Sequence, residues 1–385
     1  MFAYHMYIKS DNRKEKGMRT RTNSATWSEK QQRWSIQIQV DGVRRAFYSS
    51  TPGAAGKREC HAKADRWLQS GLTNETKRMR VAVPEWLETL KPTREGQSSS
   101  CYRQYEGFMR VRILPMIENK RVSEVSNGDI QKIIDKGVRD GLSKKTLQNI
   151  RGCMVAFFKW ARKNKLSDLR VEDIDIPWDA PKVQKEILQP DALGTLMSTD
   201  TRMCRGQLVE DYYVNAYRFQ LVTGLRPGEL LARTKADVRD GYLYITSARN
   251  TFGEITRGKN ENAVRRIKLT PLALNILKQQ AEMEKRYNVS STLLFPDKDG
   301  GYIEEHKLYK NWKAYQRGNN IPIISLYELR HTFVSVCAET VPENLLKLVV
   351  GHSESMDTQG VYGHEVNGQL DRAADAIMMS FERVK

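Results

Sequence analysis

The sequence lacks the features that place a protein in a membrane or outside the cell: a membrane-spanning helix, a secretory signal and a disulfide framework. No apolar run approaches the roughly 18 residues of a membrane-spanning helix, and the first 16 residues lack the apolar core of a secretory signal. The five cysteines are scattered, odd in number and without any C-x-x-C spacing, which argues against a disulfide framework and against a structural zinc site. We therefore expect a cytoplasmic protein that spans no membrane.

The sequence also lacks the clustered carboxylates with which metal-dependent nucleases hold Mg²⁺. The nearest candidate is E-E-H at residues 304–306, which is typical of a helix that begins at the surface. Internal repeats and low-complexity tracts are missing as well. The sequence therefore predicts no metal and no cofactor, and we expect any cleavage of a nucleic acid to proceed in EDTA.

Positive charge, in contrast, is abundant. The 385 residues include 63 Lys+Arg and 46 Asp+Glu, which gives a net charge of +17. The excess is uneven, because residues 1–80 hold 17 basic and 7 acidic residues and so carry +10 of that charge. A polyanion is the partner that such a charge favours. DNA, RNA and an acidic membrane surface each fit this charge.

The first part of the chain predicts a basic module behind a flexible, charged start at residues 1–24. Residues 33–40, R-W-S-I-Q-I-Q-V, alternate apolar and polar side chains, and a D-G turn leads into a second strand. A helical stretch then ends near Gly71, so residues 25–75 predict a small, three-stranded sheet with one helix. Arg33, Arg44 and Arg45 are candidate DNA contacts, although a solvated sheet surface explains them too.

The middle of the chain, residues 80–178, predicts a helical domain. Five apolar residues recur at helical spacing in its last helix: Leu147, Ile150, Met154, Phe157 and Ala161. Lys144, Lys145 and Arg151 lie on the opposite side of that helix, either as solvated surface or as a track for phosphates. Two prolines near residues 176–186 then indicate a linker.

Residues 185–385 predict a mixed α/β domain. Residues 242–246 and 263–269 are strand-like and predict an antiparallel pair, with a long turn between them. The last apolar stripe predicts a C-terminal helix, which either covers its own core or docks on a neighbouring subunit. The fold class is therefore multidomain and mainly α, with small antiparallel sheets.

Three motifs in this last domain carry candidate chemistry. In G-L-R-P-G-E-L, Arg226 lies beside a helix start, where its guanidinium and the helix dipole together suit a phosphate. In L-Y-E-L-R-H-T-F, Tyr327 and Arg330 share a helix face, whereas His331 suits a structural role. His352 follows Gly351 just past another helix. Taken alone, each of these residues has an ordinary explanation. Arg226 is typical of a surface residue, and His352 is typical of a helix-end residue that makes a backbone hydrogen bond.

The order of these motifs, with Tyr362 ten residues after His352, resembles the tyrosine recombinases, also called the phage integrase family. The resemblance implies an arm-binding domain at residues 25–75, a core-binding domain at 80–178 and a catalytic domain at 185–385. It also implies an integrase of a prophage or conjugative transposon that acts at the nucleoid. The implied partners are double-stranded attachment-site DNA, a homo-tetramer, an excisionase and a DNA-bending host protein.

The resemblance also implies a role for each motif residue. Tyr362 attacks a DNA phosphate and forms a 3′-phosphotyrosyl ester, while Arg226, Arg330 and His352 stabilise the charge of the transition state. Lys259, in G-K-N-E-N-A-V-R-R-I-K-L, is the candidate general acid for the leaving 5′-oxygen. The ester keeps the bond energy, so rejoining requires neither ATP nor a second activation step.

One position departs from the family pattern. The residue three before the second arginine is usually His or Lys in the family, but here it is Tyr327. A phenol still donates one hydrogen bond, although it carries no positive charge near neutral pH. Two alternatives stay open: a type IB topoisomerase, which shares the chemistry, and a DNA-binding regulator with a decayed site.

Overall fold

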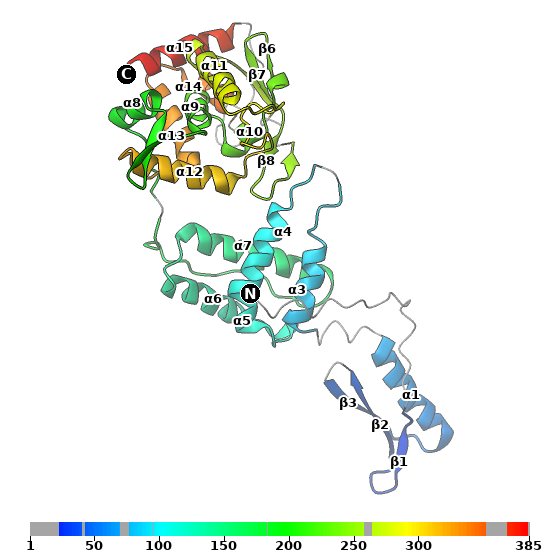
Figure 1. The fold of residues 1–385 in the computed structure, drawn as a ribbon. Helices are drawn as coiled ribbons and strands as arrows, with labels where there is room; N and C mark the ends of the chain where they lie inside the picture. The colour runs from blue at the N-terminus through cyan, green and yellow to red at the C-terminus, as the bar shows by residue number, and fades with distance from the viewer. Residues whose placement is uncertain are drawn as a thin grey trace. The chain divides into compact units, whose positions relative to one another are not determined.

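The computed structural model describes residues 23–40, 43–69, 77–94, 96–182, 184–257, 264–351 and 368–383 (Figure 1). The chain divides into two compact units. The first contains residues 1–91 and 102–182, and the second contains residues 92–101 and 183–385. Three separate hydrophobic cores lie within these units, one in each of the modules described below.

The amino-terminal module is an antiparallel sheet of three strands with one helix. Its elements are β1 (Thr26–Ser28), β2 (Arg33–Val40), β3 (Val43–Ser49) and α1 (Gly53–Gln69). Ile36 and Ile38 of β2 are buried with Cys60 and Ala64 of α1, because alternate residues of a strand point to the same face. The predicted three-stranded sheet with a helix is confirmed.

The second module is helical, as the sequence predicts for residues 80–178. Its elements are α3 (Met79–Glu88), α4 (Ser100–Phe108), the short π-helix η1 (Met109–Ile113), α5 (Leu114–Ile117), the 3₁₀ helix η2 (Val122–Glu124), α6 (Asn127–Arg139) and α7 (Lys144–Lys163). The predicted apolar stripe of α7 is buried throughout. Trp86 of α3 packs edge-on against Phe157 of that stripe, with ring centroids 5.4 Å apart.

The second unit is a mixed α/β domain. Its helices are α8 (Pro190–Ser198), α9 (Val214–Thr223), α10 (Pro227–Leu231), η3 (Lys235–Asp237), α11 (Pro271–Arg286), α12 (Glu305–Gly318), α13 (Leu326–Cys337), α14 (Glu343–Val350) and α15 (Gln369–Arg383). Its strands are β4 (Thr201–Cys204), β5 (Gln207–Glu210), β6 (Val238–Arg239), β7 (Tyr242–Ile245), β8 (Ala248–Arg249), β9 (Ile255–Thr256) and β10 (Arg265–Lys268).

Helix α9 lies at the centre of this domain. All of its residues are buried, as is usual for a helix covered on every side, and α11 and α13 pack against it. β7 pairs with β10 in the predicted antiparallel sense, and β6 completes that sheet. The expected long turn between the two strands is a partial error, because it contains a second hairpin formed by β8 and β9.

The carboxyl-terminal helix α15 covers the core of its own chain. It packs against α13, α14 and β10, and its residues Ala373, Ile377 and Phe381 belong to the core of the domain. Of the two arrangements left open by the sequence, this single chain adopts the one in cis. None of the helices in the described ranges is both long and apolar enough to cross a membrane.

The turn between α9 and α10 requires a glycine. Gly224 has a φ of +65°, and a Cβ there would lie 2.4 Å from Cδ1 of Phe333. We predict that Gly224→Ala lowers the free energy of unfolding of this domain by about 2–4 kcal/mol, because the left-handed backbone and the overpacked ring both add cost. Urea unfolding measures this.

The matched control is Gly194→Ala in α8, where an added Cβ meets nothing within 4 Å. This change should leave the domain as stable or slightly more stable, because alanine favours a helix. Equal destabilisation by both substitutions would contradict the argument.

Candidate active site

The first side chain of the site is held by the elbow before α10. Gly224 ends α9 in the left-handed conformation, Arg226 is the N-cap of α10 and Pro227 opens that helix. The Arg226 N–H donates to Glu229 Oε2 at 3.0 Å, and its Nη1 donates to Glu229 Oε1 at 2.6 Å. Arg226 is therefore fixed at both its backbone and its side chain.

Arg330 approaches the same elbow from α13. It is 2% exposed, and its Nη1 donates to the carbonyl of Gly224 at 2.8 Å. Arg226 and Arg330 are 104 positions apart in the sequence, yet both contact the region where α9 ends and α10 begins. The two predicted phosphate-binding arginines thus come together.

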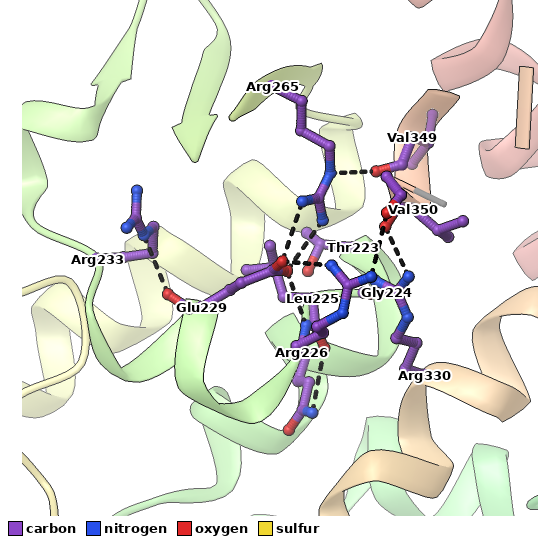
Figure 2. A network of polar contacts seen from close by, with 12 residues as sticks. Thr223, Gly224, Leu225, Arg226, Glu229, Arg233, Arg265, Arg330, Val349 and Val350 are labelled. Atoms are coloured by element: carbon purple, nitrogen blue, oxygen red, sulfur yellow. Dashed lines mark hydrogen bonds and ion pairs between the residues drawn. The ribbon is translucent and has the colours of Figure 1, made fainter. Parts of the chain in front are cut away.

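Three arginines converge on the carboxyl end of α14 (Figure 2). Arg265 Nε donates to the carbonyl of Val349 at 2.7 Å, Arg330 Nη2 to that of Val350 at 2.6 Å and Arg226 Nη2 to that of Gly351 at 3.1 Å. The last carbonyls of a helix have no partner within it and carry partial negative charge. Three cations from three other elements therefore fix the end of α14.

Glu229 is the carboxylate that joins two of these arginines. It is 3% exposed, and Arg265 Nη1 and Nη2 donate to its Oε1 and Oε2 at 3.0 and 2.9 Å. Burial alone would raise the pKa of Glu229, but the hydrogen bonds and charge of Arg265, together with those of Arg226, lower that pKa to about 2. Glu229 is therefore ionised throughout the physiological range.

The site retains an excess of positive charge. Arg226, Arg265 and Arg330 supply three charges, and Glu229 neutralises one of them. Burial and the charge of Arg226 lower the pKa of Arg330 to about 10, so it is still protonated near neutral pH. Two like charges held close together stabilise an anion placed beside them. The geometry therefore suits a phosphate.

Tyr327 and His331 lie on the same helix as Arg330. The side chain of Tyr327 is 42% exposed, and its ring lies 5.3 Å from that of His331 between centroids. Burial alone would lower the pKa of Arg226, but the charge and hydrogen bond of Glu229, together with those of Tyr327, raise that pKa above its ordinary value. Burial and the charge of Lys185 lower the pKa of His331, which fits a neutral, structural histidine.

Three of the predicted site residues lie outside the described residues. They are Lys259, His352 and Tyr362. His352 directly follows Gly351, which is the last described residue after α14. Among the residues that the structure describes, no group of three or more potential metal ligands occurs.

The candidate DNA contacts of the amino-terminal module lie on two faces of its sheet. Arg33 and Arg44 lie on the face away from α1, where Arg33 stacks 4.1 Å above Tyr48 and Arg44 Nε donates to Gln37 Oε1 at 3.0 Å. Arg45 is paired with Ile38 and shares its face. The two open-face arginines are therefore separated from Arg45.

The candidate contacts of α7 differ in how they are held. Lys145 and Arg151 are exposed. Lys144 is hydrogen-bonded to the linker after the helical module. Its backbone N–H donates to the Pro181 carbonyl at 2.8 Å, and its Nζ donates to the Trp178 carbonyl at 3.2 Å.

The sequence analysis missed two residues of the site. Glu229 and Arg265 lie within two of the quoted motifs but were given no role there, whereas together they form the buried ion pair that supports Arg226. The spacing of Glu229, three residues after Arg226, was the available signal for a capping box. No local pattern indicates the partner Arg265.

Comparisons with known proteins identify similar sequences. Residues 186–368 match the profile of the family described as the phage integrase family. A protein described as tyrosine recombinase XerC-like, from Caldanaerobacter subterraneus subsp. tengcongensis, is 20% identical over 372 residues, which are 87% of this chain and 91% of that protein.

Two solved structures share the fold. The Tn1549 transposon integrase in complex with transposon right end DNA is 19% identical, with a TM-score of 0.57, over 78% of this chain and 98% of the other. The lambda integrase dimer bound to a COC' core site is 13% identical, with a TM-score of 0.57, over 89% and 97% of the two chains.

The buried carboxylate should make the domain sensitive to acid. Because the pKa of Glu229 is lowered from 4.5 to about 2, its stabilising effect is complete above pH 4.5 and is lost as the pH falls towards 2. We predict that Glu229→Gln lowers the free energy of unfolding at pH 7 by roughly 3 kcal/mol. In this variant the free energy of unfolding should also fall less steeply as the pH is lowered from 4.5 towards 2. Urea unfolding at several pH values measures both effects.

Glu343→Gln is the matched control. Glu343 is 81% exposed and pairs with Lys347 at 2.8 Å on the surface of α14, so its loss should change little. If the free energy of unfolding falls equally steeply at acid pH in Glu229→Gln and in the unmodified protein, Glu229 is not the source of the acid sensitivity.

Proposed function

Through residues 186–368 the chain belongs to the phage integrase family, the tyrosine recombinases, and we propose that it integrates and excises a mobile element or prophage by cutting and rejoining DNA at attachment sites. It is a site-specific recombinase. We also propose the nucleophile, the proton donor, the partners and the assembly.

The observation that carries the proposal is the convergence of Arg226 and Arg330 at the end of α14. Both guanidinium groups are held by protein carbonyls, and Glu229 anchors one of them. Held in this way, the two arginines need little reorganisation when a phosphate arrives, and preorganised charge is what stabilises a phosphoryl transition state. In the sequence His352 directly follows Gly351, the C-cap of α14, which favours its role as a further donor.

In the proposed reaction, the phenol of Tyr362 loses its proton to solvent, its oxygen forms a bond to the scissile phosphorus, and the bond from phosphorus to the 5′-oxygen breaks. Lys259 gives its proton to that leaving oxygen. Arg226, Arg330 and His352 hold the non-bridging oxygens, with Tyr327 as a neutral donor beside them. A 5′-hydroxyl of a partner strand then attacks the 3′-phosphotyrosyl ester and returns its proton to Lys259, and the released Tyr362 oxygen takes up a proton from solvent.

The amino-terminal basic module favours a recombinase over a type IB topoisomerase. A second DNA contact serves to bridge two sites, whereas relaxation of supercoils requires only one. We assign residues 25–75 to arm-site binding and residues 80–178 to core-site binding. We further propose a homo-tetramer on DNA at the bacterial nucleoid, with an excisionase and a DNA-bending host protein as helpers.

Covalent trapping on nicked attachment-site DNA tests the proposal, with the DNA taken from the ends of the element that encodes the protein. In EDTA, the unmodified protein should give a protein–DNA band that survives denaturant, and Tyr362→Phe should give none, because the nucleophile is gone. Tyr327→His should retain the band, since His also donates to phosphate.

The control is specific binding to the same DNA, which Tyr362→Phe should keep. Specific binding without any covalent band from the unmodified protein would favour the regulator with a decayed site. Relaxation of plasmids without site preference would favour the topoisomerase.

The open face of the amino-terminal sheet gives a second test. Arg44→Ala should weaken binding to arm-site DNA and reduce the slope of log K against log salt by about one, because one phosphate contact is lost. Arg58→Ala is the matched control, since Arg58 lies on α1 and its Nε donates to the Ala54 carbonyl. An equal loss of slope for both substitutions would contradict the assignment of the sheet face.

A further inference from the structure

A short segment before α4 belongs to the catalytic domain. Residues 92–101 group with the second unit, although the residues on both sides of them in the sequence group with the first. Within the second unit this segment contacts the hairpin formed by β8 and β9. Neither the motifs nor the proposed function explains this contact.

The contact is a network of polar groups. The Ser99 N–H donates to Glu254 Oε2 at 2.9 Å. Asn250 Nδ2 donates to that same oxygen at 2.6 Å, to Ser98 Oγ at 3.2 Å and to Ser100 Oγ at 3.3 Å. Ser99 is 6% exposed.

The network adds to the other contacts of the hairpin, which include the hydrogen bond from Arg249 Nη1 to the Ile303 carbonyl at 3.1 Å. β8 and β9 contain two residues each, and so short a pair of strands is barely stable alone. Two of the apolar side chains beside its turn are largely exposed, Phe252 at 46% and Ile255 at 43%. Asn250 Oδ1 accepts from the N–H groups of Phe252 and Glu254, both at 3.0 Å, and so shapes the turn.

The hairpin lies beside the proposed site. The carbonyl of Arg249 in β8 approaches Gly228 so closely that a Cβ there would lie 2.4 Å from it. Gly228 is in the first turn of α10, two residues after Arg226. At its other end, β9 finishes at Thr256, which precedes Lys259 by three residues in the sequence.

We propose that Asn250 and Glu254 are positioning residues for proton transfer to the leaving 5′-oxygen. Their hydrogen bonds hold the β8–β9 hairpin against the segment that contains Ser98 and Ser100. The hairpin in turn holds β9, the strand from which the chain continues to Lys259. This inference depends on the proposed function, in which Lys259 protonates the 5′-oxygen as its bond to phosphorus breaks. Asn250 and Glu254 themselves are not expected to touch the DNA.

A change of leaving group separates this role from a merely structural one. When the bridging 5′-oxygen of the scissile phosphate is replaced by sulfur, the phosphorus–sulfur bond breaks to give a 5′-thiolate. A thiol is far more acidic than an alcohol, so this leaving group needs no proton from a general acid. Loss of proton donation should therefore slow cleavage of the oxygen substrate alone.

The experiment compares single-turnover cleavage of both substrates by the full-length protein. Glu254→Ala should slow cleavage of the oxygen substrate about 10- to 100-fold, as expected for a displaced catalytic group. Its cleavage of the sulfur substrate should stay within about twofold of the unmodified protein, because no general acid is needed there. Lys259→Ala is the reference and should show the same pattern.

A second variant tests the other side of the contact. Ser98→Ala with Ser100→Ala removes two acceptors of Asn250 Nδ2 and leaves the turn intact, so it should show the same selectivity with a smaller loss. Thr251→Ala, in the turn itself, is the matched control and should cleave both substrates normally. Equal slowing of the two substrates by Glu254→Ala, or no slowing of either, would overturn the proposal.

Failure of the proposed function has a different signature. If Tyr362→Phe cleaved the sulfur substrate, or if the unmodified protein formed no covalent adduct with it, tyrosine cleavage itself would be wrong. Normal cleavage of the sulfur substrate by Glu254→Ala also shows that this variant is folded and binds DNA.

Discussion

The buried ion pair between Glu229 and Arg265 is the interaction on which the site depends. Glu229 also binds Arg226 through the backbone and the side chain, and Arg265 also binds the end of α14. One carboxylate therefore links the elbow before α10, strand β10 and the last turn of α14. Breaking such a pair leaves an unpaired charge in the interior, which is costly, so the three elements keep one arrangement.

This arrangement concentrates like charges that would otherwise repel. The carbonyls of Gly224, Val350 and Gly351 hold Arg330 and Arg226 in place before any ligand is bound. A phosphate that enters gains from charges already positioned, whereas mobile arginines would have to be ordered first. A similar argument applies to the β8–β9 hairpin. We propose that its hydrogen bonds with residues 98–100 position the proton donor rather than the phosphate.

Much of this could be predicted from the sequence, because much of it is local. Capping residues, alternation and helical stripes predicted the amino-terminal sheet, α7, α13 and the pair β7–β10, and the motif order indicated Arg226 and Arg330. The roles of Glu229 and Arg265 were missed, because their contact joins residues 36 positions apart that no local period relates. The β8–β9 hairpin was also missed, since its strands are too short to show alternation.

The most direct test of the account is to locate the covalent bond to DNA. Trapped complexes would be digested with nuclease and trypsin, and the nucleotide-bearing peptide would be sequenced by mass spectrometry. Cleavage after Lys347 and Arg372 gives a peptide of residues 348–372 in which Tyr362 is the only tyrosine. The account predicts a nucleotide on Tyr362. A nucleotide on any other residue would contradict it.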